Sequence, residues 1–92
     1  MDTKSRVATL TKRQREIIRL ISLGCTATEI GAILNLSPAT VDNHKTRSMR
    51  LLGVGRAPLL TRIAIKHGIS PLKDQLTLAE KRRCGRKRDG WN

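Results

Sequence analysis

The chain has 92 residues, of which 19 are Lys or Arg and 7 are Asp or Glu, so its formal net charge at pH 7 is +12. This length supports one domain with a small core, and such a charge indicates an anionic partner, either nucleic acid or a membrane surface. No apolar run approaches the roughly 20 residues of a membrane span, and the first segment lacks the apolar core of a signal peptide. We therefore expect a cytoplasmic protein without a membrane partner.

The N-terminal part of the sequence predicts one helix after a flexible start. Residues 1–8 are polar, and we expect them to be frayed. Thr11 and Gln14 have the spacing of a capping box, Leu10 precedes the cap as its apolar staple residue, and Gly24 ends the helix. Three residues form its apolar face: Ile17, Leu20 and Ile21.

A helix-turn-helix is predicted over about 26–52. Thr26 begins a short helix with a second capping box, and Asn35 ends it in a left-handed conformation. After a turn of about three residues, Ser37 caps a longer helix and Pro38 takes its first position, where a missing N–H costs nothing. A short helix, a tight turn and a longer helix in this order are typical of DNA-binding proteins.

A fourth helix and a basic tail complete the chain. Pro58 opens the helix and Gly68 closes it, so the folded domain is expected to span 9–70. Residues 71–92 are predicted to be a tail, in which Thr77 can cap one short helix and residues 81–92 are disordered. The sequence thus predicts an all-α protein of four helices with a basic C-terminal tail.

The third predicted helix, 38–52, carries the strongest functional signal. At 100° per residue, Val41, Ser48 and Leu52 fall on the inward face with His44 and Leu51 beside them. The opposite face has five residues: Ala39, Asn43, Thr46, Arg47 and Arg50. Asn pairs with adenine and Arg with guanine or phosphate, which favours base contacts near the start of the helix and backbone contacts further along.

Asp42 does not fit a purely cationic face. It can favour the helix dipole near the N-terminus or accept a hydrogen bond from cytosine N4. The sequence does not choose between these roles. A solvated polar face without any ligand is the simplest alternative, but the helix-turn-helix context and the net charge argue against it.

The stretch from Leu10 to Gly68 resembles the LuxR/GerE-type DNA-binding domain of bacterial transcription regulators. The matching residues are Leu10, Thr11, Glu16, Leu20, Gly24, Glu29, Ile30, Leu34, Ser37, Thr40, Val41, His44, Leu52, Gly53, Val54, Leu60, Ala64 and Gly68. Matches spread over four helices are more specific than a lone helix-turn-helix pattern.

The resemblance implies a four-helix domain whose third helix enters the major groove of double-stranded DNA. It implies that Asp42, Asn43 and Thr46 face bases. Backbone contacts are expected from four residues: Thr28, Thr40 and Arg47 by resemblance, and Arg50 from the helical wheel. The fourth helix would form a homodimer contact, for which the outward residues Thr61 and Ile65 are the candidates. RNA polymerase is a further candidate partner.

Several positions depart from the family pattern. Ser48 replaces an apolar residue and is expected to bond back to the His44 carbonyl, while Leu51 replaces a Lys and is expected to restore apolar area. Gly31 replaces an Ala, which should cost the short helix up to about 1 kcal/mol. Asp42 stands where some members have a base-reading Lys, so their target sequences do not transfer.

The leading interpretation is a sequence-specific transcription regulator or the output domain of one, either a small stand-alone chain or a piece of a longer one. Alternatives are a sigma-factor region-4-like module, a non-specific nucleic-acid-coating protein and a small adaptor. No catalytic constellation or phosphate-binding loop is readable, so no enzyme activity and no cofactor are expected. Cys25 and Cys84 with His44 and His67 lack the spacing of zinc ligands, and a disulfide is not expected in a cytosolic protein.

Overall fold

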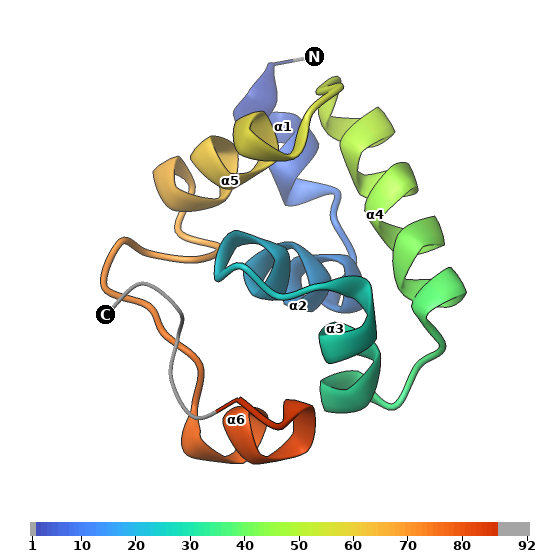
Figure 1. Cartoon of the computed structure of the whole chain (residues 1–92). Coiled ribbons are helices and arrows are strands. Elements are labelled where there is room, and N and C mark those ends of the chain that lie inside the picture. The colour runs from blue at the N-terminus through green and yellow to red at the C-terminus, as the bar shows by residue number, and fades with distance from the viewer. Residues whose placement is uncertain (1, 87–92) are drawn as a thin grey trace.

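The structure is a computed structural model that describes residues 2–86. Within these residues the chain forms helices and no strands (Figure 1). The helices are α1 (Thr3–Ala8), α2 (Lys12–Ser22), α3 (Ala27–Leu34), α4 (Pro38–Leu52), α5 (Ala57–Lys66) and α6 (Leu78–Cys84). The prediction of an all-α fold is confirmed, and the four predicted helices correspond to α2 to α5.

Capping bonds confirm the predicted starts of α2 and α3. At the start of α2, the Gln14 amide N–H donates to Thr11 Oγ1 over 3.1 Å, and the Thr11 N–H donates to Gln14 Oε1 over 2.9 Å. The same reciprocal pair begins α3. Asn35 ends α3 at φ 58° and Gly53 ends α4 at φ 71°, both left-handed. These bonds satisfy backbone groups that a helix end would otherwise leave unpaired.

Helix α2 lies at the centre and supports two apolar clusters. On one side, Ile17 and Leu20 pack with residues of α3 and with Val41 of α4. On the other side, Ile18 packs with Leu52 of α4 and with Leu60 of α5. Ile18 is fully buried although the predicted apolar face omitted it. Because α2 contributes to both clusters, it fixes the helix-turn-helix relative to α5.

Gly31 allows the tight turn between α3 and α4. A Cβ atom at this position would overlap the carbonyl oxygen of Leu36, and the Leu36 N–H donates to the Gly31 carbonyl over 2.9 Å. Helix propensity alone predicts only a cost for Gly31 in α3. In the structure Gly31 is needed for the turn, since a side chain there would push the backbone of the turn away. The close approach of this turn is available only to glycine.

Six of the eight residues that are expected to be frayed form α1 (Thr3–Ala8). The Asp2 carboxylate caps this helix by accepting the Ser5 amide N–H over 2.8 Å. Val7 is 6% exposed and packs with Leu10 and Leu52 in the second cluster. A helix of six residues has little stability of its own, so α1 depends on this contact, which a polar sequence pattern does not reveal.

The C-terminal segment is also more ordered than expected. Figure 1 shows the chain running from α5 past α2 to α6, which lies against α3. Thr77 and Glu80 form the predicted capping box of α6, and Leu76 is 3% exposed within the first cluster. The segment after residue 70 is therefore part of the folded body rather than a loose tail.

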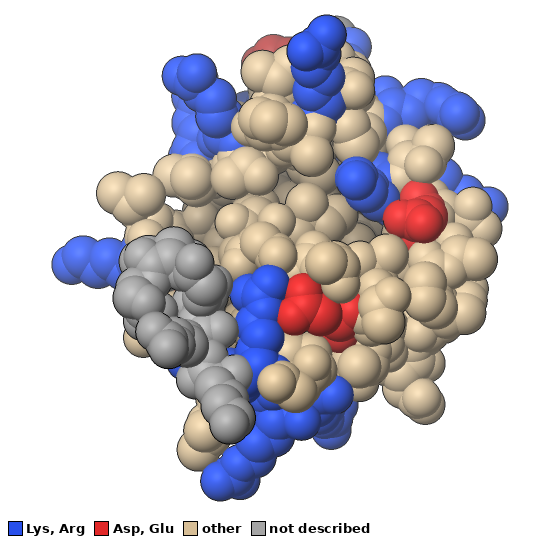
Figure 2. Space-filling model, viewed as in Figure 1, with Lys and Arg blue, Asp and Glu red and all other residues tan. Residues whose placement is uncertain are grey.

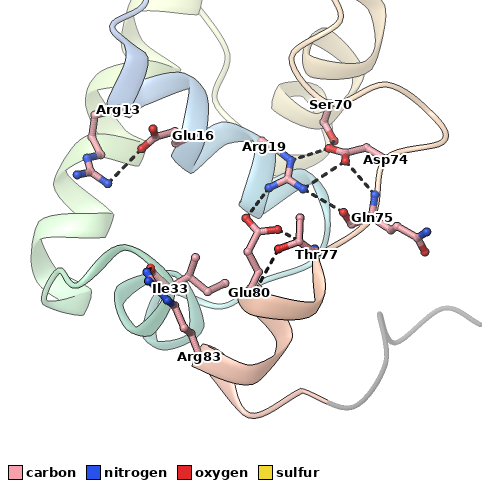
Figure 3. A network of polar contacts seen from close by, with 10 residues as sticks. All are labelled: Arg13, Glu16, Arg19, Ile33, Ser70, Asp74, Gln75, Thr77, Glu80 and Arg83. Atoms are coloured by element: carbon pink, nitrogen blue, oxygen red, sulfur yellow. Dashed lines mark hydrogen bonds and ion pairs between the residues drawn. The ribbon is translucent and has the colours of Figure 1, made fainter.

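Arg19 of α2 anchors this segment (Figure 3). Its guanidinium donates to Asp74 over 2.8 and 3.2 Å, to Glu80 over 2.7 Å and to the Gln75 carbonyl over 3.0 Å. Ser70 donates to the same Asp74 carboxylate over 3.0 Å. Charge-assisted bonds of this kind are stronger than neutral ones, and here they join residues more than 50 positions apart.

Two further arginines fasten α6 and the residues after it. Arg83 donates to the Ile33 carbonyl over 2.9 Å, and Arg86 pairs with Glu29 over 2.6 Å and donates to the Gly24 carbonyl over 2.8 Å. The expected disorder of 81–92 is thus wrong for residues 81–86, which α6 and these bonds hold in place. Its remaining part, 87–92, lies outside the described residues.

The cysteines are both free thiols. Burial raises the pKa of the Cys25 thiol to about 11, so the neutral thiol packs as a small apolar side chain. Cys84 lies against the same apolar cluster. No group of three or more His, Cys, Asp or Glu side chains in the described part of the chain is placed to hold a metal ion.

We predict that Arg19→Ala destabilises the protein by about 2 kcal/mol, because it leaves two partly buried carboxylates without their cation. Arg13→Ala is the matched control, since Arg13 forms an exposed i,i+3 pair with Glu16 and should cost no more than about 0.5 kcal/mol. Denaturant unfolding of the three proteins measures both values. Equal losses in the two variants would contradict the anchoring role of Arg19.

The same anchor predicts an acid-sensitive part of the stability. Burial raises the pKa of Asp74, but hydrogen bonds from Arg19 and Ser70 outweigh it and hold that pKa below its usual 3.8. The pKa of Glu80 is held below 4.5 in the same way by Arg19 and the Thr77 amide. A lowered folded-state pKa contributes stability above the unfolded-state value, and this contribution is lost as the pH falls through the folded-state value.

We therefore expect the unfolding free energy of the unmodified chain to fall more steeply below about pH 4 than that of Arg19→Ala. The Arg86–Glu29 pair is present in both proteins, so its own acid sensitivity cancels in the comparison. Unfolding curves between neutral and strongly acidic pH provide the measurement. Parallel pH profiles would show that the carboxylates do not depend on Arg19.

Candidate nucleic-acid interface

Helix α4 is held by a narrow buried strip. Val41, Ser48 and Leu52 are 1%, 0% and 4% exposed, as the helical wheel predicts. The Ser48 hydroxyl donates to the His44 carbonyl over 2.8 Å, which confirms the predicted back-bond and satisfies a hydroxyl that would be costly to bury alone. His44 itself is half-buried.

The placement of Leu51 on the inward side is wrong. Its side chain is 37% exposed, so it does not restore the apolar area that Ser48 lacks. The buried strip of α4 is narrower than half the helix, and Leu51 lies at its edge. Met49, on the other edge, packs against the second apolar cluster instead.

The outward face of α4 presents polar side chains that are not used inside the molecule. All the residues predicted for this face are exposed: Ala39, Asn43, Thr46, Arg47 and Arg50. Thr46 and Arg50 also border a hollow of about 350 Å³ in front of Gly55. An amide, a hydroxyl and two guanidinium groups therefore lie along one accessible side of a helix, which is the chemistry that recognises base edges and phosphates.

Most acidic residues of the described part form ion pairs or helix caps elsewhere in the fold. Glu16, Glu29, Asp74 and Glu80 are in ion pairs with arginines, and Asp2 caps α1. Within residues 2–86, no acid pairs with Arg47 or Arg50. Figure 2 shows basic side chains spread around the margin of one face, with few acidic ones between them. The cations of α4 are thus available to an external anion.

Asp42 is exposed at the edge of this face. It borders a hollow of about 120 Å³ between α3 and α4, together with Thr26 and Lys45. No ion pair or hydrogen bond links Asp42 to another described residue. Lys45, half-buried beside it, was not among the predicted site residues.

Two threonines flank the face. Thr28 is exposed in the first turn of α3, where helix N-terminal N–H groups favour phosphate. Thr40 is half-buried, and its Oγ1 lies 2.8 Å from the Ser37 hydroxyl that caps α4. Thr28 can reach a ligand directly, whereas Thr40 shares its hydroxyl with the cap.

The two predicted dimer residues of α5 differ in solvent exposure. Ile65 is 39% exposed, as expected for an outward residue. Thr61 is half-buried, and its hydroxyl donates to the Ala57 carbonyl over 3.3 Å. The core side of α5 is formed by Leu60 and Ala64, both fully buried, which confirms its predicted orientation.

None of the helices in the described region is long and apolar enough to cross a membrane.

Comparison with known proteins identifies the helical body. Residues 8–64 match the family model of bacterial regulatory proteins, luxR family. The response regulator UvrY of Escherichia coli strain K12 is 37% identical over 67 residues, which cover 73% of this chain and 31% of the relative. The transcriptional regulatory protein FixJ of Rhizobium meliloti strain 1021 is 30% identical over 70 residues, which cover 76% of this chain and 34% of the relative.

A third relative is the transcriptional activator protein BjaR1 of Bradyrhizobium diazoefficiens, which is 38% identical over 60 residues, 65% of this chain and 25% of the relative. The matched stretch thus spans between a quarter and about a third of the length of these three proteins. No solved structure matches the chain with comparable significance. Because the family model covers α2, α3, α4 and most of α5, the chain belongs to the luxR family of bacterial regulatory proteins, a family of DNA-binding transcription regulators.

Proposed function

We propose that this chain binds double-stranded DNA sequence-specifically in transcription regulation, with α4 in the major groove. The observation that carries the proposal is the outward face of α4, where accessible polar and cationic side chains have no partner inside the described molecule. A major groove is wide enough to admit one α-helix. The proposed site of action is the nucleoid in the cytoplasm, and no enzymatic activity is assigned.

The face of α4 divides into reading and clamping parts. Asp42, Asn43 and Thr46 lie nearer the N-terminal end of the helix, where helix-turn-helix proteins contact base edges. Arg47 and Arg50 follow, with Thr28 and Thr40 at the flank, and these are assigned to phosphates. Phosphate contacts fix the position on the duplex, and base contacts choose the sequence.

A non-specific coating protein and a sigma-factor region-4-like module are the competing functions. A regulator should prefer its best duplex over random DNA by ~10³ or more, which a mobility-shift titration with competitor DNA measures. If about six phosphates are neutralised, log K should fall with log salt at a slope near −5 on either duplex. Equal affinity for all duplexes would favour the coating function.

We predict that Asn43→Ala costs roughly 1–3 kcal/mol on the best site and much less on random DNA, because it removes one base-reading side chain. Arg50→Ala is the matched comparison. It should weaken both kinds of duplex alike and lower the salt slope by about 1, since it removes one phosphate contact. Both side chains are exposed, so both variants should fold.

Titrations on matched and scrambled duplexes at several salt concentrations distinguish the two effects. The reverse outcome, with Asn43→Ala weakening all sequences alike and Arg50→Ala changing the preferred sequence, would mean that the helix enters the groove with the opposite polarity. Unfolding curves of both variants confirm that the fold is intact.

A weak homodimer on DNA through α5 is part of the proposal, with Ile65 as its main contact and Thr61 beside it. RNA polymerase is proposed as a protein partner of the bound regulator. Exposed isoleucines are common, so support for the dimer comes from the position of Ile65 on a helix that the family model covers in part. Two-fold dimers bind two half-sites one helical turn apart or at multiples of that spacing.

Ile65→Glu is expected to abolish cooperative occupation of two half-sites, because it places one carboxylate from each copy in an apolar interface. Single-site affinity and stability should change little. Leu59→Glu is a matched control, since Leu59 is also exposed, at 47%, but lies on a different side of α5. Unchanged cooperativity in Ile65→Glu would exclude α5 as the interface, and a loss of fold would show that Ile65 belongs to the core.

A further inference from the structure

A hollow of about 500 Å³ lies between α1 and the C-terminal end of α5. It is lined by Thr3, Arg62, Ile63, Ile65, Lys66 and His67. This volume is within the range of small-molecule sites, roughly 300–1,000 Å³. Thr3 precedes the residues 8–64 that match the family, and Lys66 and His67 follow them, so the hollow owes part of its wall to segments outside the family domain.

The lining combines apolar and cationic groups. Ile63 and Ile65 offer apolar surface, while the side chains of Arg62 and Lys66 are exposed and have no ion pair among the described residues. No acidic residue lines the hollow. The nearby Asp2 carboxylate is occupied as the cap of α1, where it accepts the Ser5 N–H over 2.8 Å. The hollow therefore carries an uncompensated positive charge.

His67 adds a polar atom that the fold leaves unsatisfied. Its Nε2 is buried and has no hydrogen-bond partner within the described residues. A buried polar atom without a hydrogen-bond partner destabilises the fold, and such atoms call for a specific explanation. A small shift of the ring toward an oxygen atom in the hollow would give this nitrogen a partner.

We propose that this hollow binds a small organic anion with an apolar body. The anionic group pairs with Arg62 and Lys66, and the apolar body packs on Ile63 and Ile65. The hollow shares Ile65 with the proposed homodimer contact of α5, so a bound anion and a second copy of the chain would compete for this side chain. The proposal does not depend on the DNA-binding function, since none of these residues belongs to α4.

Occupation of the hollow would act on α1 first. Thr3 is the first residue of α1, and Val7 of the same helix packs with Leu52 at the C-terminal end of α4. A ligand that contacts Thr3 favours the docked α1, because it binds the folded arrangement and not the frayed one. The site is thus joined to the DNA-facing helix through one short, weakly stable element.

The test uses hexanoate and its neutral analogue hexanamide as probes on the full chain. In a ¹H–¹⁵N NMR titration, hexanoate should cause saturable shifts of the amide signals of Thr3 and of residues 62–67, and hexanamide should bind at least tenfold more weakly. Equal binding of the two probes would overturn the proposal, because the cations would then contribute nothing. Shifts that do not saturate, or that fall elsewhere, would overturn it as well.

Variants locate the charge requirement. The double variant Arg62→Gln/Lys66→Gln should lower the affinity for hexanoate at least tenfold, whereas the control Lys12→Gln, an exposed lysine at the start of α2, should leave it unchanged. An unaltered affinity in the double variant contradicts the proposal. If the double variant were unfolded, the single variant Lys66→Gln would carry the test. Binding of an acidic amphipathic peptide at the hollow, without binding of hexanoate, would identify a protein-docking surface and overturn the small-molecule site.

Discussion

The orientation of α4, the helix proposed to contact DNA, depends on one narrow strip of buried residues. Of the fifteen residues of α4, three are buried, namely Val41, Ser48 and Leu52. They lie on one line along the helix and fit against α2, which is itself packed on both sides. A small residue in the middle of this line brings α4 close to its support, and the bond from the Ser48 hydroxyl to the His44 carbonyl removes the penalty of burying it. The outward face of α4 is left free for an external partner.

Acidic and basic side chains are distributed differently in the fold. Most acidic side chains of the described residues form ion pairs, whereas many basic side chains remain exposed on the surface. The carboxylates of Glu29, Asp74 and Glu80 join segments that are distant in sequence. Each of these ion pairs consumes one of the few acids of a chain with a net charge of +12. A strongly charged chain resists compaction by self-repulsion, and the pairs offset this repulsion where segments meet. What remains on α4 is almost entirely cationic or neutral.

Local signals in the sequence predicted most of α2 to α5, and tertiary contacts decided the rest. Capping boxes and left-handed residues act within four positions of each other, so Thr11, Thr26 and Asn35 could be interpreted without a structure. That α1 and residues 71–86 are well ordered could not be predicted in this way. Their structure depends on long-range contacts such as the bond from Arg19 to Asp74, two residues that are 55 positions apart. A helical wheel assigned Val41 correctly but misplaced Leu51, since it gives the direction of a side chain and not the width of the neighbouring surface.

The candidate site was predictable to a similar extent. The outward residues of α4 followed from periodicity, because an amphipathic helix must turn its polar side away from the core. The hollow beside α5 was not predictable, since it needs α1, whose polar sequence gave no sign of a helix, and the orientation of His67, which only the three-dimensional packing fixes. Site residues that lie on one face of a single helix can be predicted from the sequence periodicity. Sites formed between two helices cannot.

Asp42 shows how an apparent defect in a cationic face can select a sequence. A carboxylate at the edge of a DNA-facing helix is repelled by phosphates, so the helix cannot settle in an orientation that turns Asp42 toward the backbone. Within the groove, a carboxylate loses its water and needs a donor in return, and cytosine N4 offers one. Guanine and thymine present no donor in the major groove, so at that position they would leave the charge desolvated and unpaired, which costs more than a missing contact. We therefore propose that Asp42 acts mainly by penalising wrong sites, while Arg47 and Arg50 would provide affinity for any duplex.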